Sequence, residues 1–530
     1  MHRYLAPLLT LTLSAPPAIA QDEPAPPPEL DPGRVILPQD PDREREREPL
    51  EIGRRTTFFE GPLREDGTVD YIAALNAKYS EGVTLENNAY VELVLLMPRA
   101  RRQEAIDAPT LEALGLPPQR EDEDACFVTW DDYAEAHGID DPHTDNYYLR
   151  EDNTVTPDGH RWLEANAAAL DRVVAATERP RYWAPMIAQG EGTDSVLSVH
   201  LPQLGYHREL TRALEARTHF KANRGDLHRA VSDILAVRRL AALQRQDPTL
   251  IGALVGISID ANALATLRHL LHTRAFDADA LEQLAAGWDD RVELVLMSEH
   301  VNVGERSMSL DLIQHLWAGR LTSDEGVFGL PRGAGYVSPR FDINRALRTI
   351  NDHYSQLTRL MRIEDYQQYQ RFSQRFYEQW EREHAMFNQD PLDIAGDVAA
   401  AALTRNRYTD LHTSLFMNVM LPALGAARNT EVRNATHEQV VFVALQCERY
   451  RLATGDIPAS LEALVPDYLD ETPLDPIDGE PLRYRTTDAG FVVYSVGTDL
   501  EDNGGVTHDF QDGGDIAVGV GIDVEPDWDD

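Results

Sequence analysis

ERYRL at 448–452, PLDPIDG at 473–479 and YSVGTD at 494–499 are the segments that decide the fold expected for this chain. A helix is predicted before the first break because apolar residues recur there at helical spacing. They are Val440, Val443, Ala444, Cys447 and Tyr450. Gly455 and Pro458 predict the end of this helix, because Gly adopts the left-handed backbone of a C-cap and Pro cannot continue a helix.

Short strands are expected after this helix. Residues 460–465 predict one short helical turn that ends at Pro466. Residues 482–485 and 491–495 predict two strands of a hairpin, and residues 516–520 a third strand. The region 429–530 is therefore expected to form a small α+β domain.

These motifs, in this order, resemble the soluble part of the major pseudopilin of type II secretion, over residues 430–520. The matching pieces are Tyr-Arg-Leu-x-x-Gly, Leu-x-x-Leu-Val, Pro-x-Asp-Pro and Tyr-Ser-x-Gly-x-Asp. The resemblance implies a pseudopilin-like module for docking or folding, stabilised by one calcium ion. The chain lacks the cleavage site and the long N-terminal assembly helix of pseudopilins, so it is not expected to be a filament subunit.

The resemblance also implies a set of calcium ligands in the loop that follows the last motif. The candidates are Asp499, Asp512 and Asp515 with the backbone carbonyl near Val496, and either Asp502, Asp509 or Asp512 completes the set. Calcium takes six to eight oxygen ligands, and no Lys or Arg follows Arg485 to neutralise these acids. A solvated acidic tail without a metal is the alternative interpretation.

The N-terminus predicts export. Residues 1–20 have an apolar run and an Ala18-Ile19-Ala20 cleavage site, which together are typical of a signal peptide. Residues 21–60 are rich in Pro and charge and are expected to form a linker. No later segment reaches the roughly 18 apolar residues of a transmembrane helix. The mature protein is therefore expected to be periplasmic or extracellular.

Charge excludes one class of partner. The 530-residue chain has a net charge of −40, which disfavours nucleic acid and anionic membrane surfaces. Cations and an envelope protein partner suit such a chain, and its oligomeric state stays open. The two cysteines, Cys126 and Cys447, leave both a disulfide and free thiols possible.

Residues 61–428 are expected to form a multi-helix body, so the chain is predicted to be mainly α. Leu210–Ala222 and Leu227–Leu243 predict a helical hairpin that resembles one tetratricopeptide unit, without a second copy at the 34-residue period. The segment Trp130–Tyr148 has poor periodicity and is expected to be a surface insertion. The combination of signal peptide, helical body and tail resembles uncharacterised exported bacterial proteins, which implies no activity.

The body contains few candidates for chemistry, because the standard nucleophile, phosphate, dinucleotide and zinc-protease motifs are absent. Glu299, Asp311 and His315 are the candidate acid–base residues. Asp311 and His315 are four residues apart, so they share a helix face and can pair as an oriented base or as metal ligands. A surface ion pair is the alternative interpretation.

Three function classes follow from these patterns. The first is an exported, non-catalytic envelope protein with a helical binding scaffold and a calcium-stabilised docking domain. The second is a periplasmic hydrolase or lyase that uses Glu299, Asp311 and His315. The third is a glycan or small-molecule binder with Trp130, Trp162 and Trp183 as an aromatic platform, for which core packing is the alternative.

Overall fold

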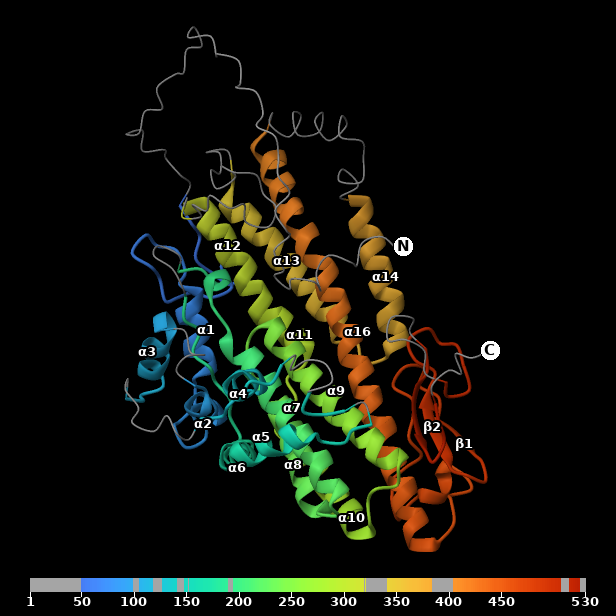
Figure 1. Ribbon diagram of the computed structural model, residues 1–530. Helices are drawn as coiled ribbons and strands as arrows, with labels where there is room; N and C mark the ends of the chain where they lie inside the picture. The colour runs from blue at the N-terminus through green and yellow to red at the C-terminus, as the bar shows by residue number, and fades with distance from the viewer. Residues whose placement is uncertain are drawn as a thin grey trace, which may run out of the picture. The chain divides into compact units, whose positions relative to one another are not determined.

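The computed structural model describes residues 49–98, 104–117, 126–140, 147–150, 152–188, 194–318, 320, 341–383, 404–506 and 514–524. Residues Arg47–Asp530 form one compact unit. The described part of this unit is mostly helical and contains one three-stranded antiparallel sheet (Figure 1). The expectation of a mainly α chain is confirmed.

Short helices form the N-terminal part of the unit. They are α1 (Tyr71–Tyr79), α2 (Ala89–Leu96), α3 (Glu104–Ala113), α4 (Trp130–His137), α5 (Pro157–Ala165) and α6 (Ala167–Ala176). Polar side chains fix where most of them begin: Asp70, Asn88, Thr129 and Thr156 each accept a hydrogen bond from a backbone N–H of the first turn. The 3-10 turn η2 (Val196–Ser198) lies in the connection between α6 and the longer helices that follow.

The predicted helical hairpin is confirmed as α7 (Pro202–Asn223) and α8 (Leu227–Gln244), and α9 (Leu250–His272) packs on both. Among the described residues, α9 is the one helix long and apolar enough to cross a membrane. In this fold 67% of its apolar window is buried. It packs as a core helix between α8 and α16.

The remaining helices of the body follow α9. They are α10 (Ala278–Ala286), α11 (Met297–Glu299), the π-helical segment η3 (His300–Glu305), α12 (Arg306–Ala318), α13 (Ile343–Met361) and α14 (Tyr366–Glu383). Figure 1 shows four of the helices side by side: α12, α13, α14 and α16. Helix α13 contacts each of the other three.

The C-terminal region begins on α16, a 50-residue helix over Arg405–Thr454. It ends where predicted, since Gly455 adopts the left-handed backbone with φ 89°. One 3-10 turn, η6 (Leu461–Leu464), then leads to β1 (Arg483–Thr486), β2 (Phe491–Ser495) and β3 (Ile516–Val520). The sheet order is β1-β2-β3, with Tyr484 opposite Val493 and Val493 opposite Val518.

The sheet and the body share one hydrophobic core. Val493 and Val518 of the sheet belong to the same buried cluster as Ala444 of α16 and Leu267 of α9. The backbone N–H of Gly521 also donates to the carbonyl of His272 at the end of α9. The boundary predicted at 428/429 therefore lies inside α16, and the sheet packs on the body.

Two further expectations need correction. The linker predicted over 21–60 is wrong from residue 49 onward, because Asn344 of α13 donates to the carbonyl of Pro49 at 2.9 Å and Tyr71 donates to that of Thr57 at 2.7 Å. Residues 21–48 lie outside the described residues. The predicted surface insertion at Trp130–Tyr148 is also wrong, since Trp130 and Tyr148 are buried in an aromatic core with Trp162.

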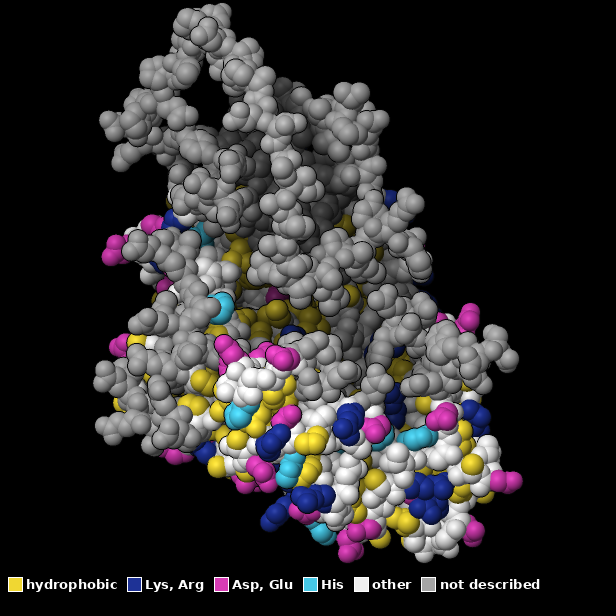
Figure 2. All heavy atoms as spheres, in the orientation of Figure 1, with side chains coloured by type: hydrophobic (Ala, Val, Ile, Leu, Met, Phe, Trp, Pro, Cys, Tyr) yellow, Lys and Arg dark blue, Asp and Glu magenta, His cyan; other side chains and the backbone are white. Residues whose placement is uncertain are grey.

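Both cysteines are free: Cys447 is fully buried on α16, and Cys126 is half-buried. On the face drawn in Figure 2, the described basic side chains lie interspersed with acidic ones and do not gather into one patch.

Candidate functional site

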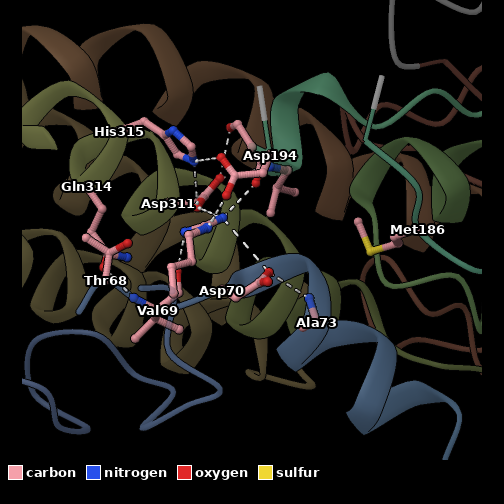
Figure 3. A network of polar contacts seen from close by, with 12 residues as sticks. Thr68, Val69, Asp70, Ala73, Met186, Asp194, Asp311, Gln314 and His315 are labelled. Atoms are coloured by element: carbon pink, nitrogen blue, oxygen red, sulfur yellow. Dashed lines mark hydrogen bonds and ion pairs between the residues drawn. The ribbon is translucent and has the colours of Figure 1, made fainter. Parts of the chain in front are cut away.

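Asp311 on α12 is the centre of a buried polar network (Figure 3). Its Oδ2 accepts hydrogen bonds from the Ser195 hydroxyl at 2.9 Å and from the backbone N–H of Val196 at 2.8 Å. Its Oδ1 lies 3.3 Å from Arg64 Nη2 and 3.4 Å from His315 Nε2. Both carboxylate oxygens are therefore engaged inside the protein.

Arg64 joins this carboxylate to two further segments. Its Nε lies 2.5 Å from the Asp194 carboxylate, and its Nη1 donates to the carbonyl of Val69 at 2.5 Å. Beside it, Gln314 of α12 accepts from the backbone N–H of Val69 at 2.9 Å. The network thus ties the segments around residues 64–70 and 194–196 to one face of α12.

Two of the three predicted acid–base residues lie together. Asp311 and His315 are 0% and 1% exposed, so the pair is buried, and the alternative of a surface ion pair is wrong. Glu299 does not join them: it is partly exposed and pairs with Arg362 at 2.8 Å. Because Asp311 has no contact with solvent and its lone pairs are occupied, the arrangement is suited to holding chain segments together.

A second buried polar group surrounds η3, close in sequence to the candidate acid–base residues but not among them. Burial raises the pKa of Glu305 to about 7, although the carboxylate accepts from the N–H of Leu250. Burial lowers the pKa of His300 to about 4. A six-residue π-helical segment is too short to show its periodicity in the sequence, so only Gly304 signals the close backbone approach.

Asp475 of the Pro-x-Asp-Pro motif holds the tail together. Its carboxylate accepts from the Ser495 hydroxyl at 2.8 Å, from the N–H of Val496 at 3.1 Å and from the N–H of Ile477 at 2.9 Å. Arg483 of β1 donates to it at 2.8 Å. This buried carboxylate therefore fixes the 473–479 loop on the end of β2, directly before the acidic loop.

The acidic loop folds around Asp515, which is 3% exposed. Its Oδ2 accepts from the backbone N–H groups of Asn503 at 3.1 Å and Gly505 at 2.7 Å. Its Oδ1 is buried and has no hydrogen-bond partner among the residues that the structure describes. Burial raises the pKa of Asp515, and the negative charges of Asp502 and Asp499 raise it further.

The other predicted ligands in this loop are placed only in part. Asp499 and Asp502 accept from the backbone N–H groups of Glu501 and Gly504, and so shape the turns of the loop. Asp509 and Asp512 lie outside the described residues. Within the described residues, no three acidic, His or Cys side chains converge closely enough to hold a metal ion. Oxygen donors and one unpartnered buried carboxylate oxygen nevertheless suit a hard cation.

The tryptophans of the predicted glycan platform pack in the core. Trp162 is 1% exposed and donates from Nε1 to the carbonyl of Val128 at 2.8 Å. Trp130 and Trp162 border a hollow of only about 90 Å³, and Trp183 does not line it. This volume is far below the roughly 300 Å³ at which small-molecule pockets begin.

No family model matches the chain, and no curated protein and no solved structure is significantly similar to it.

Proposed function

We propose that this chain is an exported, non-catalytic protein of the cell envelope. Its helical body is a binding scaffold for an envelope partner, and residues 430–520 form a pseudopilin-like docking module stabilised by calcium. The observation that carries the proposal is the Asp515 carboxylate, which is buried in an acidic loop and has one oxygen without a partner in the described part of the chain.

Burial of an ionised carboxylate without a full set of partners is unfavourable. Around Asp515 the penalty is increased by the charges of Asp499 and Asp502. A bound divalent cation would remove both effects, and an all-oxygen set of donors favours calcium over zinc or copper. The proposed ligands are Asp499, Asp512 and Asp515 with the carbonyl of Val496, completed by Asp502 or Asp509. Binding would have to draw the described acids together, because no three of them converge in the described part of the loop. When bound, calcium would supply charge neutralisation and loop closure.

The order of elements in the tail also supports the module. A long helix capped by Gly455, the η6 turn, the loop fixed by Asp475 and the β1–β2 hairpin follow one another as the resemblance implies. The buried state of Asp311 supports the non-catalytic part of the proposal, because a substrate cannot reach a carboxylate that has no exposed surface.

The test is thermal and chemical unfolding of the mature chain in chelator and in about 10 mM calcium. Extracellular calcium modules bind at about 10⁻⁴ to 10⁻³ M. At 10 to 100 times that dissociation constant, calcium should stabilise the folded chain by roughly 1.4 to 2.7 kcal/mol. Magnesium at the same concentration should have a smaller effect, because it requires octahedral geometry and loses its water reluctantly.

A matched pair of double variants identifies the loop as the site. Asp499→Asn with Asp515→Asn should abolish the calcium effect. Asp470→Asn with Glu471→Gln removes the same charge from exposed positions of the same region and should preserve it. Equal calcium effects in the two double variants, or none in the wild type, would show that the acids are only a solvated tail.

Docking is tested separately with the same variants. The tagged full chain should retain an envelope partner in calcium and release it in chelator. The Asp499→Asn, Asp515→Asn variant should fail to retain it even in calcium. Retention that is the same in all three conditions would remove the docking role while leaving a metal-stabilised fold.

A further inference from the structure

A groove of about 390 Å³ lies between α14 and α16, which Figure 1 shows side by side. Helix α14 supplies most of its lining, α16 supplies Asn429, and the acidic loop supplies Leu500. The lining residues are Gln367, Tyr369, Gln370, Arg371, Ser373, Gln374, Tyr377, Asn429 and Leu500. Its volume lies within the roughly 300–1,000 Å³ of small-molecule sites.

The side of the groove formed by α14 is fixed by contacts with α16. The Tyr366 hydroxyl donates to Asn429 Oδ1 at 3.2 Å, and the Tyr366 ring stacks on that of Tyr369 at 5.9 Å between centroids. The Tyr377 hydroxyl packs directly against Gly425 of α16. A Cβ at position 425 would overlap with this hydroxyl, so only glycine leaves room for it. The two lining tyrosine rings are therefore held in place from α16.

The tail closes one end of the groove. Arg433 of α16 donates to the Thr498 hydroxyl at 3.3 Å, and Gln367 of α14 lies 3.5 Å from the carbonyl of Asp478. Leu500 follows in the same loop with a left-handed backbone, φ 63°, and reaches the groove. A ligand in this groove would therefore contact both the helical body and the tail.

The lining side chains are mostly polar and uncharged, which indicates the class of ligand. In a chain with a net charge of −40, the lining contains one arginine and no acid. Four carboxamides, from Gln367, Gln370, Gln374 and Asn429, each donate and accept hydrogen bonds. Sugar hydroxyl and acetamido groups also do both. The partly exposed ring of Tyr377 can contact the C–H side of a sugar ring, whereas Tyr369 is 2% exposed and belongs to the core behind the groove.

We propose that this groove binds a short oligosaccharide that is neutral or carries a single negative charge. An extended peptide is less suited, because peptide-binding grooves offer a free strand edge or apolar and aromatic pockets, whereas most lining side chains here are polar. The inference gives the proposed binding scaffold a site and a ligand class, and rests on that part of the proposed function. None of the lining side chains is a proposed calcium ligand, although Leu500 lies beside Asp499 in the acidic loop.

The experiment is isothermal titration calorimetry of the full mature chain with three disaccharides. The probes are cellobiose, N,N′-diacetylchitobiose and the disaccharide of N-acetylglucosamine with N-acetylmuramic acid. At least one should bind saturably. Gln370→Ala with Gln374→Ala should weaken it about tenfold or more, because two hydrogen-bonding groups are lost. Gln368→Ala, on the same helix but outside the lining, should leave the affinity unchanged.

Arg371→Gln separates the neutral ligand from the anionic one. It should weaken only the muramic acid disaccharide, whose carboxylate pairs with the guanidinium. Absence of saturable binding by all three sugars overturns the inference, as does equal binding by the wild type and the Gln370→Ala, Gln374→Ala variant. Binding of an uncharged extended peptide but of no sugar also overturns it. Because calcium stabilisation is measured without sugar, failure of the groove and failure of the metal site are distinguishable.

Discussion

The buried side chain of Asp311 connects segments of the chain that are far apart in sequence. Its carboxylate contacts Arg64, which is 247 positions away in sequence, and also Ser195 and His315. Removal of one partner from a buried ion pair leaves the other charge uncompensated. Loss of Asp311 is therefore expected to lower the free energy of unfolding by more than loss of an exposed ion pair would.

Asp311→Asn should destabilise the chain by about 3–5 kcal/mol, because it leaves the Arg64 guanidinium buried without its full counter-charge. Glu299→Gln breaks the exposed pair with Arg362 and should change stability by about 0–1 kcal/mol. Urea unfolding of both variants at pH 7 measures the difference. Similar losses in the two variants would show that Asp311 contributes no more than a surface charge.

For single residues, the sequence predicted that Asp311 and His315 pair, but not the network of contacts around them. The four-residue spacing was enough to place Asp311 and His315 on one helix face. Arg64 and Asp194 come from distant loops, and no local pattern links them to α12. Asp515 was predicted through the resemblance, whereas Asp475, which fixes the neighbouring loop, was seen only as part of a turn.

Among the elements, η3 has the tightest backbone packing. Gly304 faces the carbonyl of Pro248, in the connection between α8 and α9, so closely that a Cβ would overlap with that oxygen. Glu305, next in sequence, accepts from the N–H of Leu250 at the start of α9. The π-helical widening therefore lets η3 pack directly against this connection.

Gly304→Ala should destabilise the chain by about 1–3 kcal/mol, the usual effect of overpacking. Gly205→Ala is the control, because Gly205 also lies in a helix, α7, and a Cβ there meets no atom within 4 Å. That variant should be neutral or stabilised by up to about 1 kcal/mol, since alanine has the higher helix propensity. The midpoints of urea unfolding report both values, and a neutral Gly304→Ala would contradict the packing argument.

Element prediction succeeded where local signals and packing agree. The hairpin of α7 and α8 and the three strands have clear periodicity and clear breaks. The long helix α16 is different, because Pro422 and Gly425 lie inside it and both normally indicate a helix end. Contacts with α9, α13 and the sheet keep it helical, and such tertiary contacts are invisible in a single sequence.

In the whole molecule, several buried titratable groups act together on stability. Burial lowers the pKa of His207, His219, His300 and His437 to about 4 each. Between pH 6.5 and 4 these four histidines bind more protons in the unfolded chain than in the folded one. Their contribution to stability therefore falls as the pH falls through this window. Burial raises the pKa of Glu215 and Glu305 to about 7, which has the opposite effect between pH 4.5 and 7.

The four histidines outnumber the two glutamates, so the chain should lose stability on acidification from pH 6.5 to 4. Glu305→Gln isolates the opposing contribution. Its stability should match that of the wild type near pH 4.5, and exceed it by about 2–3 kcal/mol at pH 8, where the wild-type carboxylate is ionised and buried. Urea unfolding across this pH range measures both effects. A difference that does not change with pH would show that Glu305 is not the titrating group.

The last described strand has a consequence for how the chain is made. β3 pairs with β2, and Gly521 next to it bonds to the end of α9, so the core shared by α9, α16 and the sheet is complete only with residues near 520. The ribosome synthesises these residues after α9 and α16. Until β3 has emerged, the nascent polypeptide exposes the apolar surface that the sheet will cover. For a chain proposed to cross a membrane, this delay keeps α9 and α16 from packing into their final core, so that the chain can still pass through a translocation channel.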